Sequence, residues 1–206
     1  MKIKPSLIAF EGTECAGKTT AMAQLKKYIE DTYGLEVVVT RAPGGTPVGA
    51  KIREIIVGSD HSEMSKTTNA LLFAADYRQT LETVVMPALK RGAMVITDRI
   101  NLTMRIYQNT PEAEMLAKMN DKIITPELIF IMTTPFEVFV ERRDARDAAL
   151  NNARDYIEKD VHDAYVERYL TYADVHPSTC AVIDCLGSQT DVIGEVISTF
   201  DRRIRQ

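Results

Sequence analysis

Short apolar runs alternate with longer amphipathic segments along the whole chain. The apolar runs predict five β-strands, at residues 7–10, 36–40, 94–97, 128–132 and 181–183. Nearly every position within them is apolar, which is typical of strands covered on both faces. Between them, the spacing of apolar positions predicts helices over about 18–33, 48–57, 66–91, 111–121, 136–150, 155–174 and 189–204.

This regular alternation favours βαβ units arranged around one parallel sheet. We therefore expect an α/β fold of three layers, with a five-stranded parallel sheet flanked by helices. A chain of 206 residues is long enough to bury its own core without a metal or a disulfide. Because no linker, repeat or low-complexity tract interrupts the pattern, residues 1–206 are expected to form a single domain.

Composition narrows the possible partners. The net charge of −4 gives no electrostatic reason to expect a nucleic-acid polymer or an anionic membrane surface. The three cysteines, Cys15, Cys180 and Cys185, include no C-x-x-C pair that would indicate zinc or a redox centre. The first apolar run is shorter than a signal-peptide core, and no later stretch approaches the length of a membrane span. We expect a protein of the reducing cytoplasm.

One segment carries phosphate-binding chemistry. Residues 12–19, Gly-Thr-Glu-Cys-Ala-Gly-Lys-Thr, match G-x-x-x-x-G-K-[ST] and lie between the first predicted strand and the first predicted helix. Glycines let the backbone curl until several N–H groups and the helix N-terminus point at one polyphosphate. Lys18 adds a charge near the β- and γ-phosphates, and Thr19 offers a hydroxyl to Mg²⁺. The alternative is a plain glycine turn. The residues expected to bind the nucleotide are Gly12, Thr13, Cys15, Ala16, Gly17, Lys18, Thr19 and Thr20.

An acidic and a basic residue follow the third predicted strand. Asp98 ends this strand and Arg99 comes next. The carboxyl ends of parallel strands converge on one crevice, so this pair is expected to face the glycine-rich loop. Asp98 is then a candidate metal ligand together with Thr19, and Arg99 a candidate phosphate ligand. Taken alone, Asp98 would more often be a turn residue, and Arg99 next to it changes that balance.

Five segments occur in the order found in one known family. They are Phe-Glu-Gly-Thr-Glu-Cys-Ala-Gly-Lys-Thr-Thr at 10–20, Arg-Ala-Pro-Gly-Gly-Thr-Pro at 41–47, Leu-Leu-Phe-Ala-Ala-Asp at 71–76, Asp98-Arg99 with Thr103 and Tyr107-Gln108, and Val-Ile-Asp at 182–184. Through these segments the chain resembles the thymidylate kinases over nearly its whole length. The resemblance implies a P-loop NTPase fold, a homodimer, and transfer of the γ-phosphoryl group of ATP, with Mg²⁺, to a deoxynucleoside monophosphate. The first candidate acceptor is dTMP.

The resemblance also implies roles for single residues. Glu14 is expected to reach the sugar 3′-hydroxyl or the metal shell, and Arg41 and Arg99 the acceptor phosphate. Phe73 is expected to stack on the base, and Tyr107 to lie under the deoxyribose, where its ring leaves no space for a 2′-hydroxyl. Without the resemblance, Phe73 would be assigned to the core of a long helix and Tyr107 to a half-buried helix face. The expected acceptor site is Glu14, Arg41, Phe73, Tyr77, Arg99, Thr103, Tyr107 and Gln108.

An arginine-rich stretch lies where the family has a mobile lid, at about 141–156. Its alternative interpretation is a solvated helix surface. Bringing an acceptor phosphate against ATP crowds several negative charges, so cations must surround the transferring group. Some family members carry an arginine inside the glycine-rich loop, where this chain has Ala16, so closure of the lid is expected to supply the charge. The expected catalytic residues are Lys18, Glu14, Arg99, Arg142, Arg143, Arg146 and Arg154.

Several positions depart from the family pattern. Ala42 stands in place of a glutamate, Ile100 of a tyrosine or histidine, Thr133 of an aspartate and Tyr156 of an arginine. These departures keep open a second interpretation, a nucleotide-binding regulator without transfer activity. A third, a kinase for a nucleoside or another small acceptor, is disfavoured because such an acceptor has no phosphate for two additional arginines to bind.

The departure with the largest consequence is Tyr77. Four residues after the stacking phenylalanine, the family has an arginine that donates to a thymine carbonyl, whereas here the arginine is Arg78. One residue rotates a helical side chain by about 100°, so Arg78 does not inherit the contact. Tyr77 is expected to offer a single hydroxyl instead, which leaves a relaxed or altered base preference as an alternative.

Overall fold

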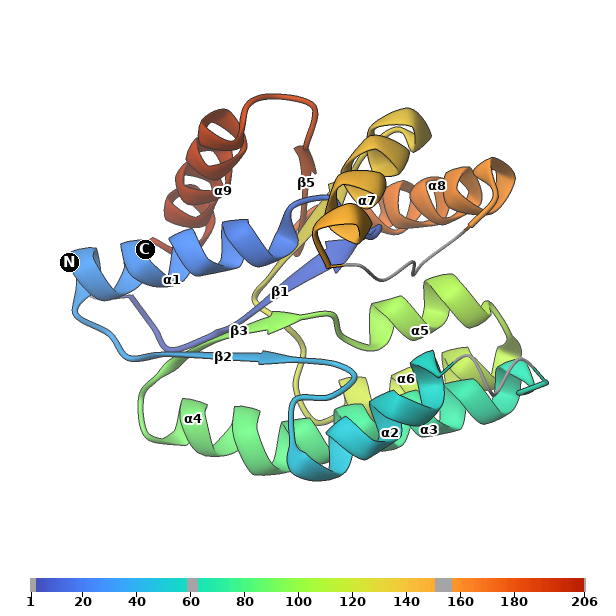
Figure 1. Ribbon diagram of the computed structural model, residues 1–206. Helices are drawn as coiled ribbons and strands as arrows, with labels where there is room; N and C mark the ends of the chain where they lie inside the picture. The colour runs from blue at the N-terminus through green and yellow to red at the C-terminus, as the bar shows by residue number, and fades with distance from the viewer. Residues whose placement is uncertain (1–2, 59–62, 151–156, 206) are drawn as a thin grey trace.

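A computed structural model of the chain (Figure 1) describes residues 3–58, 63–150 and 157–205. Its centre is a parallel sheet of five strands in the order β2-β3-β1-β4-β5. The expected α/β architecture is confirmed, and each strand lies within two residues of its prediction. The strands are β1 (Leu7–Gly12), β2 (Val37–Arg41), β3 (Met94–Asp98), β4 (Leu128–Thr133) and β5 (Cys180–Asp184).

Helices cover both faces of the sheet. One face is covered by α1 (Lys18–Tyr33) and α9 (Gln189–Ile204), which lie side by side in Figure 1. The other is covered by α3 (Lys66–Thr80), η2 (Leu81–Val85), α4 (Met86–Lys90), α5 (Asn101–Gln108), α6 (Pro111–Asp121) and α8 (Lys159–Val175). Two further helices pack on this layer, α2 (Pro47–Val57) on α3 and α7 (Phe136–Leu150) on α8.

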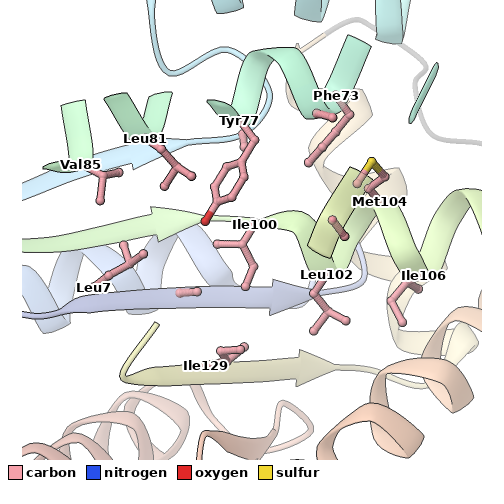
Figure 2. Packing of buried hydrophobic residues seen from close by; sticks show 14 of the residues in the cluster. Leu7, Phe73, Tyr77, Leu81, Val85, Ile100, Leu102, Met104, Ile106 and Ile129 are labelled. Atoms are coloured by element: carbon pink, nitrogen blue, oxygen red, sulfur yellow. The ribbon is translucent and has the colours of Figure 1, made fainter. Parts of the chain in front are cut away.

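Alternating residues of the central strand supply the two hydrophobic cores. Leu7 and Ala9 of β1 belong to the core under α3 and α5, and Ile8 and Phe10 belong to the core under α1 and α9. This is the period of two that a pleated strand imposes, with both faces buried. Figure 2 shows the first of these cores, where the helical layer packs down onto β1 and its neighbours.

One difference between the predicted and the observed helices has a local cause. The helix expected over 66–91 has a π-helical turn at Leu81–Val85, where the backbone N–H of Met86 donates to the carbonyl of Leu81. Pro87 has no N–H to continue the ladder, and a wider turn just before it accommodates the missing donor.

The helix α5 was not predicted, and α8 begins at Lys159 rather than at 155. The first turn of α5 is capped by a glutamate from β1: a carboxylate oxygen of Glu11 accepts from the backbone N–H groups of Ile100 (2.8 Å) and Thr103 (3.0 Å). Sequence patterns detect caps that lie next to a helix in the chain. This cap comes from about 90 residues away, so a local pattern cannot show it.

Strand register brings three functional segments to one edge. In the sheet Phe10 of β1 and Arg41 of β2 both pair with Asp98 of β3. The carboxyl ends of these strands therefore lie next to one another, with the glycine-rich loop leaving β1 at the same edge. Within 3–58, 63–150 and 157–205, every helix is too short or too polar to cross a lipid bilayer.

Candidate functional site

The glycine-rich loop depends on glycine at its first position. Gly12 has a φ of 128°, and a Cβ atom built there would lie 1.7 Å from the carbonyl oxygen of Met132. The loop passes too close to β4 for any other residue. Gly17, with a φ of 91°, ends the loop and caps α1, whose N-terminus points into the space the loop encloses.

Lys18 curls back under this loop. Its Nζ atom donates to the carbonyl oxygens of Gly12 (3.1 Å) and Thr13 (2.6 Å). Burial, together with the positive charge of Arg99, lowers the pKa of Lys18, although nearby carboxylates oppose the effect. A buried ammonium in this situation favours an anionic ligand as its counter-charge. The Thr13 hydroxyl is also buried and has no hydrogen-bond partner among the described residues.

A cavity of about 720 Å³ opens between this loop and the end of β3. Among the described residues, six basic side chains line it and two acidic ones, although the whole chain carries a charge of −4. Positive charge is therefore concentrated at this one site, as binding of phosphate groups requires. The charged lining residues are Lys18, Arg41, Arg53, Arg99, Arg142, Arg146, Glu14 and Asp98.

Arg99 borders the cavity beside the glycine-rich loop. It pairs with Glu14, and its Nη1 donates to the Thr103 hydroxyl at 3.1 Å. Tyr107 donates its hydroxyl to Glu14 at 2.9 Å and also lies within 3.4 Å of Arg99. Although burial acts to raise it, the charges of Arg99 and Lys18 lower the pKa of Glu14 below its ordinary value. Glu14 is therefore ionised at neutral pH and holds Arg99 and Tyr107 together.

The candidate metal ligands border the same cavity. Thr19 lies at the start of α1 and Asp98 at the end of β3, and both line the space next to Lys18. The Oδ1 atom of Asp98 is buried and has no hydrogen-bond partner among the described residues. A hydroxyl and an uncommitted carboxylate oxygen form a hard oxygen donor set, which fits Mg²⁺.

The arginines of the predicted lid occupy different environments. Arg142 and Arg146 of α7 line the cavity, and Arg142 also donates to the carbonyl oxygens of Cys15 (3.4 Å) and Cys185 (2.8 Å). Arg143 lies instead over the ring of Phe139 and pairs with Asp144, outside the cavity lining formed by the described residues. In this arrangement of α7, Arg143 does not face the cavity, and its expected role after lid closure stays a prediction. Arg154 and Tyr156 lie outside the described residues.

The expected base-reading role of Tyr77 is wrong. Its side chain is 2 % exposed, belongs to the hydrophobic core and is absent from the cavity lining that the described residues form. Figure 2 shows it between Phe73 and Leu81, with its hydroxyl directed at the sheet. One helical turn carries the chain about 5.4 Å along the axis, which takes Tyr77 away from the cavity and over the strands. Arg78 also faces elsewhere, donating to Asn120 at 3.0 Å and pairing with Glu82.

Phe73 belongs to both the cavity wall and the hydrophobic core. It borders the cavity, yet it is only 3 % exposed and packs in the core. Beside it, Gln108 donates to the Oδ1 atom of Asn69 at 2.5 Å, which pairs two amides from α3 and α5 at the cavity wall. Asn69 precedes Phe73 by one turn, so it lies on the same helix face, where it is more exposed than Phe73.

Sequence reasoning missed several lining residues. Arg53, Ile56 and Val57 of α2 and Asn69 of α3 border the cavity. For Asn69, its position four residues before Phe73 was a usable signal. A smaller cavity of about 230 Å³ lies on the other side of the loop and was not predicted, since its walls combine segments distant in the sequence. It is lined by Cys15, Ala16, Gly17, Thr20, Ala21, Arg142, Cys185, Gly187, Gln189, Val192 and Ile193.

A parallel sheet with the glycine-rich loop between β1 and α1, and a basic cavity at the carboxyl ends of the strands, defines a P-loop nucleotide-binding protein of the NTPase class. The thymidylate kinase family model matches residues 10–196. The chain therefore belongs to the thymidylate kinase family.

Individual relatives agree over nearly the whole length. The chain is 34 % identical to the thymidylate kinase of Desulfosudis oleivorans, covering 95 % of this chain and 96 % of the relative. It is also 34 % identical to that of Caulobacter vibrioides, covering 92 % and 94 %. The crystal structure of thymidylate kinase from Ehrlichia chaffeensis superposes with a TM-score of 0.72 at 25 % identity, covering 96 % and 99 %. The resemblance found in the five sequence segments is confirmed.

Proposed function

We propose that this protein transfers the γ-phosphoryl group of ATP to dTMP, giving ADP and dTDP. The observation that carries the proposal is one cavity of about 720 Å³ whose lining includes both the glycine-rich loop with Lys18 and the two arginines Arg41 and Arg99. Two phosphorylated ligands bound in it, one at the loop and one at these arginines, meet end to end. Membership of the thymidylate kinase family supports dTMP as the acceptor.

On the donor side, the backbone of the loop and the N-terminus of α1 hold the triphosphate, with Lys18 at the β- and γ-phosphates. The smaller cavity shares Cys15, Ala16, Gly17, Thr20 and Arg142 with the larger one. Its remaining walls are mostly small and apolar, and we assign the adenine base to it. Mg²⁺ bound by Thr19 and Asp98 would neutralise charge on the phosphates.

On the acceptor side, Arg41 and Arg99 hold the phosphate of dTMP. An oxygen of that phosphate forms a bond to the γ-phosphorus of ATP, and the bond from this phosphorus to the β-bridging oxygen breaks, releasing ADP. A nucleotide phosphate is already anionic near neutral pH, so no general base is needed. The protein contributes position and positive charge, and Arg142 and Arg146 supply that charge from the proposed lid at 141–156.

The sugar and base contacts follow from the same wall. Tyr107 supports the deoxyribose, and its ring is stacked on Tyr165 of α8 with centroids 4.3 Å apart. Phe73, Asn69 and Gln108 face the base. We further propose a homodimer through exposed apolar residues of α2 and α3, among them Val48 and Leu71, and a cytoplasmic location, where ATP is supplied.

The proposal is tested by incubating the purified protein with ATP, Mg²⁺ and each of dTMP, dUMP, dCMP, dGMP, dAMP and thymidine, and by measuring ADP and the phosphorylated product. The expected result is dTDP formation with dTMP as the best acceptor. Turnover of thymidine without turnover of dTMP would indicate a nucleoside kinase, and ATP binding without any transfer would indicate a regulator. Lys18→Ala is the control: it should keep the fold and lose about two to three orders of magnitude in kcat.

A further inference from the structure

Glu11 is a buried carboxylate that the proposed reaction does not use directly. It lies in β1 just before the glycine-rich loop and is 0 % exposed. Besides capping α5, it accepts hydrogen bonds from the hydroxyls of Thr103 (2.7 Å) and Tyr169 (2.8 Å). Burial raises the pKa of Glu11, and the charge of Arg99 and these hydrogen bonds oppose the rise. Four donors around one carboxylate favour its ionised form.

The two hydroxyls connect Glu11 to Arg99. Each hydroxyl has one proton, and when that proton is donated to Glu11 the oxygen lone pairs are left to accept. The Nη1 atom of Arg99 lies 3.1 Å from the Thr103 oxygen and 3.4 Å from the Tyr169 oxygen. Donors and acceptors therefore run in one direction, from guanidinium through hydroxyl to carboxylate. Chains of this kind strengthen each member in a buried setting.

Arg99 needs support of this kind. Its backbone has a φ of 75°, an unusual conformation for a residue with a side chain, held by a hydrogen bond from its N–H to the carbonyl of Phe10 (2.9 Å). The other nitrogen, Nη2, faces Glu14 and Tyr107 in the cavity. Nη1 contacts Thr103, which borders the cavity, and Tyr169, which is 0 % exposed and absent from the cavity lining that the described residues form. The Tyr169 contact therefore fixes the plane of the guanidinium independently of what the cavity holds.

We propose that Glu11 and Tyr169 are positioning residues that orient the Arg99 guanidinium for the acceptor phosphate through the Thr103 and Tyr169 hydroxyls. The inference rests on the proposed function, because it assigns the acceptor phosphate to Arg99. Neither Glu11 nor Tyr169 touches the substrate. Both act by fixing the fork of nitrogen donors that a phosphate group has to meet.

The path from Glu11 through the Thr103 and Tyr169 hydroxyls to Arg99, here called the relay, also ties Arg99 to helix α8, because Tyr169 belongs to that helix. Helix α8 follows the arginine-rich stretch in the chain. Two more contacts fasten α8 to α5: Tyr165 stacks on Tyr107, and Arg168 donates to the carbonyl oxygen of Ile106 at 2.7 Å. Helix α5, which carries Thr103 and Tyr107, and helix α8 are thus packed together, and Arg99 contacts residues of both.

If the Tyr169 hydroxyl positions Arg99, its removal should weaken binding of dTMP and leave binding of ATP nearly unchanged. The test is Tyr169→Phe, which keeps the ring and removes only the hydroxyl. We expect the KM and the Kd for dTMP to rise about tenfold, the loss of one hydrogen bond in a charged network. The KM for ATP should stay within about twofold. Glu11→Gln should act in the same direction, because the amide cannot accept from both hydroxyls and both N–H groups.

The decisive comparison is a double-mutant cycle with Arg99→Ala, read out as dTMP affinity by calorimetry. If Tyr169 acts through Arg99, Tyr169→Phe should have no further effect once Arg99 is gone. Additive effects, or an unchanged dTMP affinity in Tyr169→Phe, would overturn the proposal. Tyr172→Phe is the matched control, since Tyr172 lies on the same helix and stacks on His176, and it should leave both affinities unchanged.

The calorimetric cycle, read together with the phosphorylation assay on the wild type, separates the proposed relay from the proposed function. A wild-type protein that binds dTMP but does not phosphorylate it contradicts the proposed function, while the calorimetric cycle still decides the relay. A wild-type protein that phosphorylates dTMP with no coupling between Tyr169 and Arg99 contradicts the relay alone. If the wild type neither binds nor phosphorylates dTMP, both proposals are wrong.

Discussion

Restoring the family arginine at position 77 should damage the fold instead of sharpening base recognition. Tyr77 is 2 % exposed and packs against Leu81 in the core (Figure 2). In Tyr77→Arg, the lost aromatic packing costs about 3–5 kcal/mol, and burying a guanidinium without a partner adds to it. Even the lower figure corresponds to a fall of roughly 6–12 °C in Tm for a chain of this size.

The assay combines thermal unfolding with base preference. Thr67→Arg, at an exposed polar position of α3, is the matched control, and its stability should change by no more than about 0.5 kcal/mol. The relative turnover of dTMP, dUMP and dCMP should be the same in wild type and Thr67→Arg. A Tyr77→Arg protein with wild-type Tm and a stronger preference for dTMP would show that this position faces the base, and would refute the assignment of Tyr77 to the core.

Three further outcomes are expected. Gly12→Ala should destabilise the protein by about 3 kcal/mol or more and abolish ATP binding, because its Cβ would meet the Met132 carbonyl at 1.7 Å; a soluble variant with normal ATP affinity would contradict the loop geometry. Asn69→Leu should raise the KM for dTMP about fivefold, as loss of one hydrogen bond would, and reduce discrimination among bases; unchanged discrimination would exclude Asn69 as a base contact. Chelation of Mg²⁺ should stop transfer and leave the calorimetric affinity for dTMP intact, whereas loss of dTMP binding would place the metal on the acceptor side.

The sequence was sufficient for those parts of the site that follow from strand topology. Asp98 and Arg99 follow the glycine-rich loop by about 80 residues, yet both border the cavity with Lys18. Strand ends of a parallel sheet converge whatever lies between them in the chain. The same rule places Arg41, which pairs with Asp98 in the β2–β3 register.

The parts that could not be predicted depend on position along an element and on contacts between distant segments. Phe73 and Tyr77 do share a helix face, as their spacing indicates, but a four-residue spacing does not show which turn lies at the cavity and which lies over the sheet. The helix α5 begins where Glu11 caps it. Glu11 is an acidic residue at the end of an apolar strand, and that conflict was the available signal for a buried network.

The claim that the donor and acceptor sites meet in one cavity is tested most directly with a single molecule in which adenosine and thymidine are joined 5′ to 5′ by a chain of phosphates. Calorimetry should show one molecule bound per chain, with affinity lowered in both Lys18→Ala and Arg99→Ala. ATP alone should lose affinity chiefly in Lys18→Ala, and dTMP alone chiefly in Arg99→Ala. If dTMP still binds at full affinity while the joined molecule is bound, the two sites are separate and the claim is wrong.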